Sequence, residues 1–260
     1  MIGLGAFTVF VLGLRHGADP DHLAAIDNVT RNAYGATPRL SRFVGTFFAG
    51  GHAVMVLAIS ALVGLLGARF AAHGAVIETI GTWVSIVVLL VVAAMNLRAL
   101  RAGEARVAGA RTKFLPRALR EGSSALVAVP IGLLFGFGFE TSSQIVAYGL
   151  AFGNGNGILG AVLVGAMFSV GMICTDTLDS LFVHRLISDR SSRRPAVMRV
   201  WILSVALLAF AVAAYELAGL FGLRVPFGDL TVSAVLVGAL SAVFAYIFVR
   251  TRRAEETAAA

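Results

Sequence analysis

Charged residues are scarce in this chain. Only 13% of its 260 residues are Asp, Glu, Lys or Arg, whereas 58% are hydrophobic, and the mean hydropathy is +0.87. Soluble domains carry about 25% charged residues, so this composition excludes a soluble protein and indicates an integral membrane protein. Nothing in the sequence suggests a separate soluble domain, and we expect residues 1–260 to form a single membrane domain.

Three further features are missing. The single cysteine, Cys174, excludes an intramolecular disulfide. The N-terminus has neither the basic region nor the small-residue cleavage pattern of a secretory signal, because its first basic residue, Arg15, follows the apolar run. No GxxxxGK[ST] motif is present, so we expect the chain to have no ATPase of its own.

Long apolar runs are abundant. A membrane-spanning helix needs about 20 apolar residues, and seven runs of this kind occur, near 3–26, 43–67, 78–98, 124–150, 157–182, 200–221 and 229–249. The pattern predicts an all-α fold, a polytopic transmembrane helical bundle of about seven spans. Spans one to three and four to six each open with a span rich in polar residues, which would suit two inverted three-span repeats.

The basic residues give the expected orientation. Nearly all Lys and Arg lie in the predicted loops 28–42, 99–122 and 184–199 and in the tail 250–260. The alternate loops hold only Arg69 and Arg224. This bias predicts that the basic loops and the C-terminus are cytoplasmic and that the N-terminus is outside. Because the net charge of +7 is spread over short loops, we expect no nucleic-acid partner.

The stretch from Arg15 to Arg31, RHGADPDHLAAIDNVTR, concentrates polar residues at the end of the first apolar run. Placing one Asp or Arg at membrane depth costs about 2.5–3.5 kcal/mol of insertion free energy, so a cluster of such residues indicates a functional site. Helical spacing puts His16, Asp19 and His22 on one stripe. Asp21 lies off it, but Pro20 and Gly17 favour a local unwinding that would bring Asp21 inward. The alternative is a packed interface whose polar groups satisfy one another.

Polar residues recur in three later spans. His52 follows two glycines, Glu140 lies one turn from Ser143 and Gln144, and Asp176 and Asp179 lie one turn apart. His52 alone would more often be a satisfied interface histidine. Two neighbouring carboxylates in lipid are harder to explain by packing, and a cation between them would offset their cost. Imidazole with carboxylate suits Ni²⁺, Co²⁺ or Zn²⁺ better than Mg²⁺ or Ca²⁺.

These residues resemble the motifs of the nickel/cobalt transporter (NiCoT) family of secondary permeases. The pattern H-x4-D-H within RHGADPDHLAAIDNVTR is similar to the family form RHAxDADHIxAIDNxTR. FFAGGHAVMV, GFGFETSSQI and GMICTDTLDS resemble the remaining motifs, in the same order. The resemblance covers the whole chain. Gly17, Ala18, Pro20, Glu140 and Gln144 depart from the family pattern, and the family's usual leading span is missing here.

The resemblance implies a transporter that imports nickel and/or cobalt across the cytoplasmic membrane of a prokaryote. The implied metal residues are His16, Asp19, Asp21, His22, His52, Glu140, Asp176 and Asp179. It implies a divalent cation as substrate, with no enzymatic activity, no catalytic residues, no cofactor and no required ATPase subunit.

Two alternatives stay open. An exporter of related fold would tend to carry a histidine-rich cytoplasmic loop, and the predicted loop 99–122 contains no histidine. An intramembrane metalloenzyme would need HExxH or several histidine boxes, whereas the chain lacks HExxH and has five histidines. The sequence leaves open the preferred metal, the energy source and the oligomeric state.

Overall fold

A computed structural model describes residues 2–66, 74–101, 124–136, 157–188 and 195–223, with isolated positions between 231 and 249. This part of the chain is helical and contains no strand, which confirms the predicted all-α class. Its longer helices are α1 (Ile2–Gly17), α2 (Pro20–Ala36), α4 (Val44–Leu66), α6 (Gly74–Arg101), α8 (Ala128–Gly136), α10 (Gly157–Ser188) and α11 (Pro195–Leu220). The short elements are α3 (Pro38–Ser41) and the 3-10 turn η1 (Ala125–Val127).

The first apolar run is broken between α1 and α2. The turn that closes α1 has 3-10-type bonds, from the Ala18 amide to the Arg15 carbonyl (3.0 Å) and from the Asp19 amide to the His16 carbonyl (3.0 Å). Pro20 then opens α2, at a position where its missing N–H leaves no helical bond unmade. The predicted unwinding around Gly17 and Pro20 is therefore present as a complete helix break.

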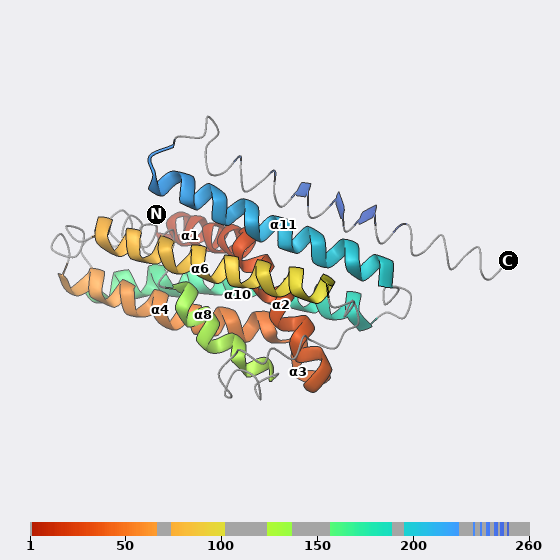
Figure 1. Cartoon of the computed structure of the whole chain (residues 1–260). Coiled ribbons are helices and arrows are strands. Elements are labelled where there is room, and N and C mark those ends of the chain that lie inside the picture. Colours follow the sequence, from red (N-terminus) through yellow and green to blue (C-terminus); the bar gives the residue numbers. More distant parts are fainter. Residues whose placement is uncertain are drawn as a thin grey trace.

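Helix α10 is the centre of the bundle, in contact with α1, α2 and α4; α8 packs on α4, and α11 packs on α6 and α2 (Figure 1). Small residues permit the close crossings. A Cβ atom on Gly13 of α1 would collide with the Phe168 carbonyl of α10, and one on Gly132 of α8 would collide with the Phe48 carbonyl of α4. Gly136, one turn after Gly132 on α8, lies against Met55 and His52.

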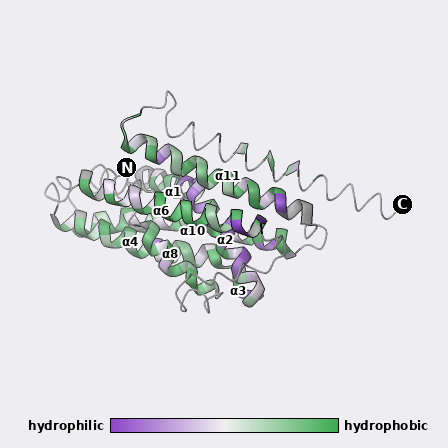
Figure 2. Ribbon diagram, in the orientation of Figure 1, coloured by the Kyte–Doolittle hydropathy of each residue, from purple (hydrophilic) through white to green (hydrophobic). Residues whose placement is uncertain are grey.

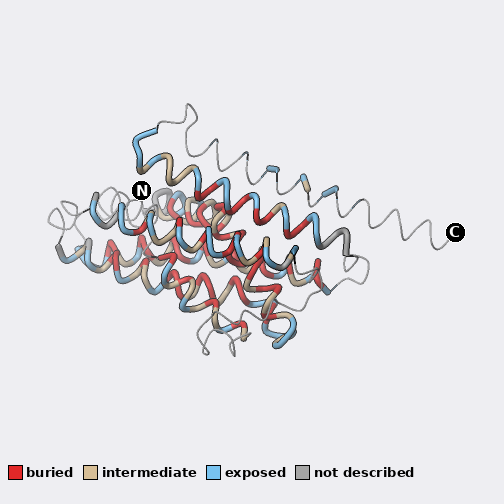
Figure 3. The backbone as a smooth tube through the Cα atoms, in the orientation of Figure 1, coloured by how far each residue is buried: buried red, intermediate tan, exposed pale blue. Residues whose placement is uncertain are grey.

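Four of the described helices are long and apolar enough to cross a membrane, over Val44–Leu62, Thr79–Arg98, Gly157–Ser188 and Arg199–Leu220. They match four of the predicted spans. Hydrophobic residues cover these long helices (Figure 2), and burial concentrates between them while their outer faces are exposed (Figure 3). Trp83, Leu207 and Phe210 are among the exposed outward residues. An apolar exterior around a buried polar interior is the arrangement that a bilayer requires.

The segment 28–42 differs from the predicted loop, because α2 continues to Ala36 and α3 follows it. Asn28, Thr30 and Arg31 are buried there. The helix continues because Asn96 of α6 accepts hydrogen bonds from the buried Asn28 and Arg31 side chains. The predicted loops 99–122 and 184–199 are also shorter than expected, since α6 extends to Arg101, α10 to Ser188, and α11 begins at Pro195.

Several predictions fall outside the described residues. Glu140 and the second half of the predicted span 124–150 lie there, as do most of the span 229–249 and the tail 250–260. The single-domain organisation, the inverted repeats and the membrane orientation stay predictions.

Candidate metal centre

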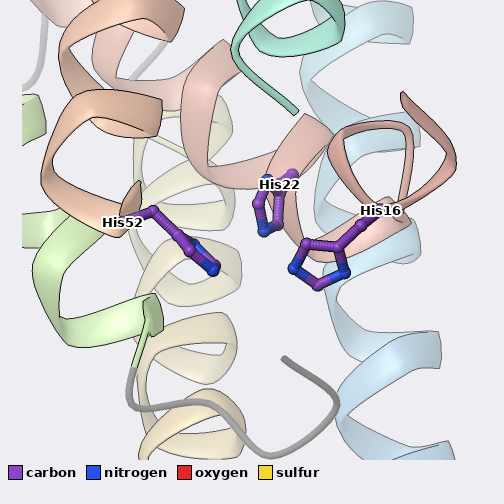
Figure 4. A group of neighbouring side chains, drawn as sticks. All are labelled: His16, His22 and His52. Carbon is purple, nitrogen blue, oxygen red and sulfur yellow. The ribbon is translucent and has the colours of Figure 1, made fainter. Parts of the chain in front are cut away.

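Three histidines meet where α1, α2 and α4 face α10. His16 comes from the last turn of α1, His22 from the first turn of α2, and His52 from α4. One ring nitrogen of each lies within 4.8 Å of the others, and the ring centroids are 4.7–5.3 Å apart. The three rings turn toward one another (Figure 4), and all three residues are buried.

The helix break is what brings the first two histidines together. Because α1 ends at Gly17 and α2 starts in a new direction at Pro20, the His16 and His22 rings meet edge to face, 4.7 Å apart. Gly51, next to His52, brings the α4 backbone against the carbonyl of Val129 in α8.

Carboxylates fix two of the three imidazoles. Nδ1 of His22 lies 3.2 and 3.3 Å from the two oxygens of Asp176, and Nδ1 of His16 lies 3.1 Å from Oδ2 of Asp19. An ionised carboxylate only accepts hydrogen bonds, so each Nδ1 donates and each Nε2 keeps its lone pair. Nε2 of His22 is buried and has no hydrogen-bond partner among the described residues. A carboxylate that holds the second nitrogen of a histidine is characteristic of metal-binding imidazoles.

Phenyl rings enclose the cluster. His22 packs edge-on against Phe48 (5.0 Å between centroids) and Phe135 (6.1 Å), and His16 lies 5.3 Å from Phe168. Phe168 also belongs to an apolar cluster with Val9 and Val56, which covers one side of the histidines. These rings exclude water, which strengthens the interaction between a cation and the neighbouring carboxylates.

The other predicted acidic residues are arranged differently. Asp21 is half-buried, and its Oδ1 accepts from the His22 amide (2.9 Å), so the carboxylate caps the start of α2. Asp179 lies one turn beyond Asp176 on α10 and makes no hydrogen bond to the histidine rings among the described residues. Its Oδ2 is buried and has no hydrogen-bond partner among the described residues. The structure thus joins His16, His22 and His52 with Asp19 and Asp176.

Sequence reasoning missed a second buried polar group, the Asp27 network, formed by Asp27, Arg31, Asn96 and Trp201. Arg31 binds Asp27 through Nε (2.8 Å) and Nη2 (2.6 Å). The indole of Trp201 donates to the other oxygen of Asp27 (2.6 Å), and Asn96 accepts from Arg31 (2.7 Å). The i, i+4 spacing of Asp27 and Arg31 was the available signal.

A fourth described histidine lies elsewhere. His184, near the C-terminal end of α10, has its Nδ1 2.8 Å from the Ser41 hydroxyl and its ring 5.3 Å from Tyr34. It is half-buried and takes no part in the histidine cluster.

The fold and this centre together define a multi-pass helical membrane protein that encloses three inward-facing imidazoles backed by carboxylates. The family model for high-affinity nickel-transport proteins, NicO, matches residues 2–105 and 101–252. The chain belongs to this family.

Individual relatives have similar names. The chain is 34% identical to the hydrogenase nickel incorporation protein HupN of Bradyrhizobium diazoefficiens over 205 residues. This alignment covers 67% of the chain and 52% of HupN. It is 31% identical to a high-affinity nickel transport protein of Cupriavidus necator (68% and 58% covered). It is 34% identical to the cobalt transport protein NhlF of Rhodococcus rhodochrous (69% and 59% covered). The matched parts thus span only 52–59% of these three relatives. No solved structure matches the chain.

Proposed function

We propose that this chain imports Ni²⁺ and/or Co²⁺ across the cytoplasmic membrane as a secondary transporter. The observation that carries the proposal is the cluster of His16, His22 and His52, whose ring nitrogens lie within 4.8 Å of one another inside an apolar bundle. Membership of a nickel-transport family and relatives named for nickel and cobalt transport support the choice of metals.

The metal would bind the three imidazoles, with Asp176 and Asp19 orienting His22 and His16 from behind. The ring nitrogens lie within 4.8 Å of one another. A first-row divalent ion holds its nitrogen ligands at about 2.0–2.1 Å from the metal, so a bound ion would draw the nitrogens closer together. A small inward rotation of the rings would close the site on the ion. Asp21, Asp179 and Glu140 would flank the path of the ion.

Imidazole ligands would make the site selective for transition metals over Mg²⁺ and Ca²⁺. Nitrogen donors suit Ni²⁺, Co²⁺ and Zn²⁺, whereas Mg²⁺ and Ca²⁺ prefer sites made wholly of oxygen. Three histidines in a water-excluding bundle would therefore reject the abundant hard cations and retain trace transition metals. Because the transported species is the metal itself, the proposal needs no catalytic residue and no cofactor.

The driving force can come from the membrane. An inside-negative potential favours entry of a divalent cation by about 4.6 kcal/mol per 100 mV. This is the basis for proposing a secondary transporter that works without an ATPase subunit, in the orientation that the basic loops predict.

Metal accumulation in a bacterium that lacks nickel and cobalt uptake tests the proposal. Cells expressing the chain should accumulate trace Ni²⁺ or Co²⁺, and His22→Ala should reduce uptake at least about 100-fold because it removes a metal ligand. His184→Ala is the matched control, since this histidine lies outside the cluster, and it should transport normally.

The same experiment identifies the rivals. Lower accumulation than in empty cells would indicate export. Unchanged accumulation of Ni²⁺, Co²⁺, Zn²⁺ and Mn²⁺, with the protein present in the membrane, would overturn the proposal.

A further inference from the structure

The end of α1 leaves one backbone carbonyl without its usual partner. In a continuing α-helix each carbonyl accepts a hydrogen bond from the amide four residues later. Where α1 ends, the Ala18 amide bonds instead to the Arg15 carbonyl, three residues back (3.0 Å). The carbonyl of Leu14, four residues before Ala18, therefore loses the amide that a longer helix would supply.

A hydroxyl of the neighbouring helix takes the place of that amide. Oγ1 of Thr175 in α10 donates to the Leu14 carbonyl (2.9 Å). Glycines bring the two backbones close enough for this bond, since a Cβ on Gly171, one turn before Thr175, would lie 2.7 Å from the Leu14 amide nitrogen. A Cβ on Gly17 would lie 3.0 Å from Cβ of Thr175. The final turn of α1 thus lies directly on this part of α10.

The next residue of α10 holds the other side of the helix break. The carboxylate oxygens of Asp176 lie 3.2 and 3.3 Å from Nδ1 of His22, in the first turn of α2. The same carboxylate faces the end of α1, since a Cβ on Gly17 would lie 3.0 Å from its Oδ1. Two consecutive residues therefore connect α10 to the two helices that meet at the break. Thr175 holds the backbone of α1, and Asp176 holds the imidazole of α2.

The position of His16 depends on the α1 side of this arrangement. His16 lies two residues after Leu14 in the last turn of α1, so its ring moves with that turn. Its Nδ1 lies 3.1 Å from Oδ2 of Asp19, three residues later in the same stretch of chain, so this bond orients the ring without attaching it to α10. Because the His16 and His22 rings are 4.7 Å apart, a small displacement of the end of α1 changes how the two imidazoles face each other.

We infer that Thr175 is a positioning residue of the metal centre. Its hydroxyl fixes the end of α1 on α10 through the Leu14 carbonyl and thereby sets the position of His16 relative to His22. The inference rests on the proposed function for the identity of the ion, and it adds a residue that acts on metal affinity without touching the metal. A hydroxyl that only joined two helices would contribute to stability and leave metal affinity unchanged.

Calorimetric titration with Co²⁺ tests this inference on the purified full-length chain in lipid nanodiscs. Thr175→Val replaces the hydroxyl with a methyl group and cannot donate to the Leu14 carbonyl. Its affinity for Co²⁺ should fall about tenfold, at the lower end of the roughly 10–100-fold losses for groups behind metal ligands, because the effect passes through the backbone. Thr175→Ser retains the hydroxyl and should bind Co²⁺ as wild type does. If Thr175→Val does not fold, Thr175→Ala takes its place with the same expected loss.

Ser180→Ala is the matched control. The Ser180 hydroxyl makes the same kind of bond from α10, to the Arg42 carbonyl that precedes α4 (2.9 Å), but this carbonyl lies outside the break between α1 and α2. Ser180→Ala should lower the midpoint of thermal unfolding about as much as Thr175→Val does, and it should leave Co²⁺ affinity unchanged. Unchanged affinity of a folded Thr175→Val chain would overturn the inference, as would an equal loss of affinity in Ser180→Ala.

Double variants identify the route by which Thr175 acts. In a His16→Ala chain, adding Thr175→Val should weaken Co²⁺ binding by less than about twofold, because the histidine that Thr175 positions is absent. In a His52→Ala chain, the same change should still weaken binding about tenfold, since His52 belongs to α4. An equal loss in both backgrounds would show that Thr175 does not act through His16 and would overturn the inference.

Failure of the proposed function gives a different pattern. Import is tested by metal accumulation and the His22→Ala variant, whereas the inference is tested by Co²⁺ affinity. A chain that binds Co²⁺ but accumulates no metal would overturn import and leave the comparison of Thr175 variants intact. A chain that accumulates metal and binds Co²⁺ equally with and without the Thr175 hydroxyl would overturn only the inference.

Discussion

The histidine cluster and the Asp27 network are both buried polar groups built partly on α2, yet their hydrogen bonding differs. In the network, three donors occupy the two oxygens of Asp27. In the cluster, carboxylates fix Nδ1 of His16 and His22, and Nε2 of His22 is left without a hydrogen-bond partner among the described residues. The two oxygens of Asp27 are satisfied by the protein itself, whereas Nε2 of His22 is left for a ligand from outside.

This difference separates two kinds of buried polar group in a membrane protein. In a closed group the polar atoms bond to one another, and in a binding site one atom is left for a ligand. Removing a member of the network should therefore lower stability, whereas removing a carboxylate behind the cluster should lower metal affinity.

The largest expected effect is that of Asp27→Ala. It leaves the buried guanidinium of Arg31 without its counterion, which should lower the free energy of unfolding by about 3–5 kcal/mol. Unfolding of the purified protein by denaturant in mixed micelles measures the loss. The double variant Asp27→Ala/Arg31→Met should recover much of it, because an apolar pair needs no counterion. A loss below about 1 kcal/mol for the single variant would contradict the closed-network interpretation.

Asp176→Asn should have the next largest effect, on affinity. Asn preserves the shape behind His22 but removes the charge that fixes its tautomer, so Co²⁺ or Ni²⁺ affinity should fall about 10–100-fold. Calorimetric titration of the purified protein measures this. Cys174→Ser is the control, because this exposed residue lies two positions away on the same helix. Equal affinity of Asp176→Asn and wild type would show that Asp176 does not support the site.

The smallest effect concerns the packing that positions the cluster. A Cβ on Gly51 would collide with the Val129 carbonyl, whereas one on Gly50 meets no atom within 4 Å. Gly51→Ala should lower the free energy of unfolding by about 1–3 kcal/mol. Gly50→Ala should leave it unchanged or raise it by up to about 1 kcal/mol, since Ala favours helix. Thermal unfolding compares the two, and equal midpoints would contradict the tight α4–α8 contact.

Much of the cluster could be predicted from sequence because it depends on local spacing. Helical periodicity predicted His16 and His22 on one stripe of a regular helix, whereas they lie on two helices because α1 ends at Gly17 and α2 begins at Pro20. Pro20 with Gly17 indicated this break. The apolar lengths of α4, α6, α10 and α11 were likewise readable, because a bilayer imposes them.

The remaining features depend on tertiary contacts that no local pattern encodes. His52 joins the cluster through the packing of α4 against α10, α8 and α2. The segment after Asp27 was predicted as a loop, yet Asn96 of α6 accepts hydrogen bonds from its Asn28 and Arg31 side chains.

The long-range pairing of the first helices has a consequence for biosynthesis. Asp176 is synthesised 154 residues after its partner His22, and Trp201 is synthesised 174 residues after its partner Asp27. At a synthesis rate of about 5–20 residues per second, these intervals last roughly 8–35 s. During that time His22 lacks its carboxylate partner and Asp27 has only the local Arg31. Helix α2 therefore reaches its final contacts only after α10 and α11 have emerged.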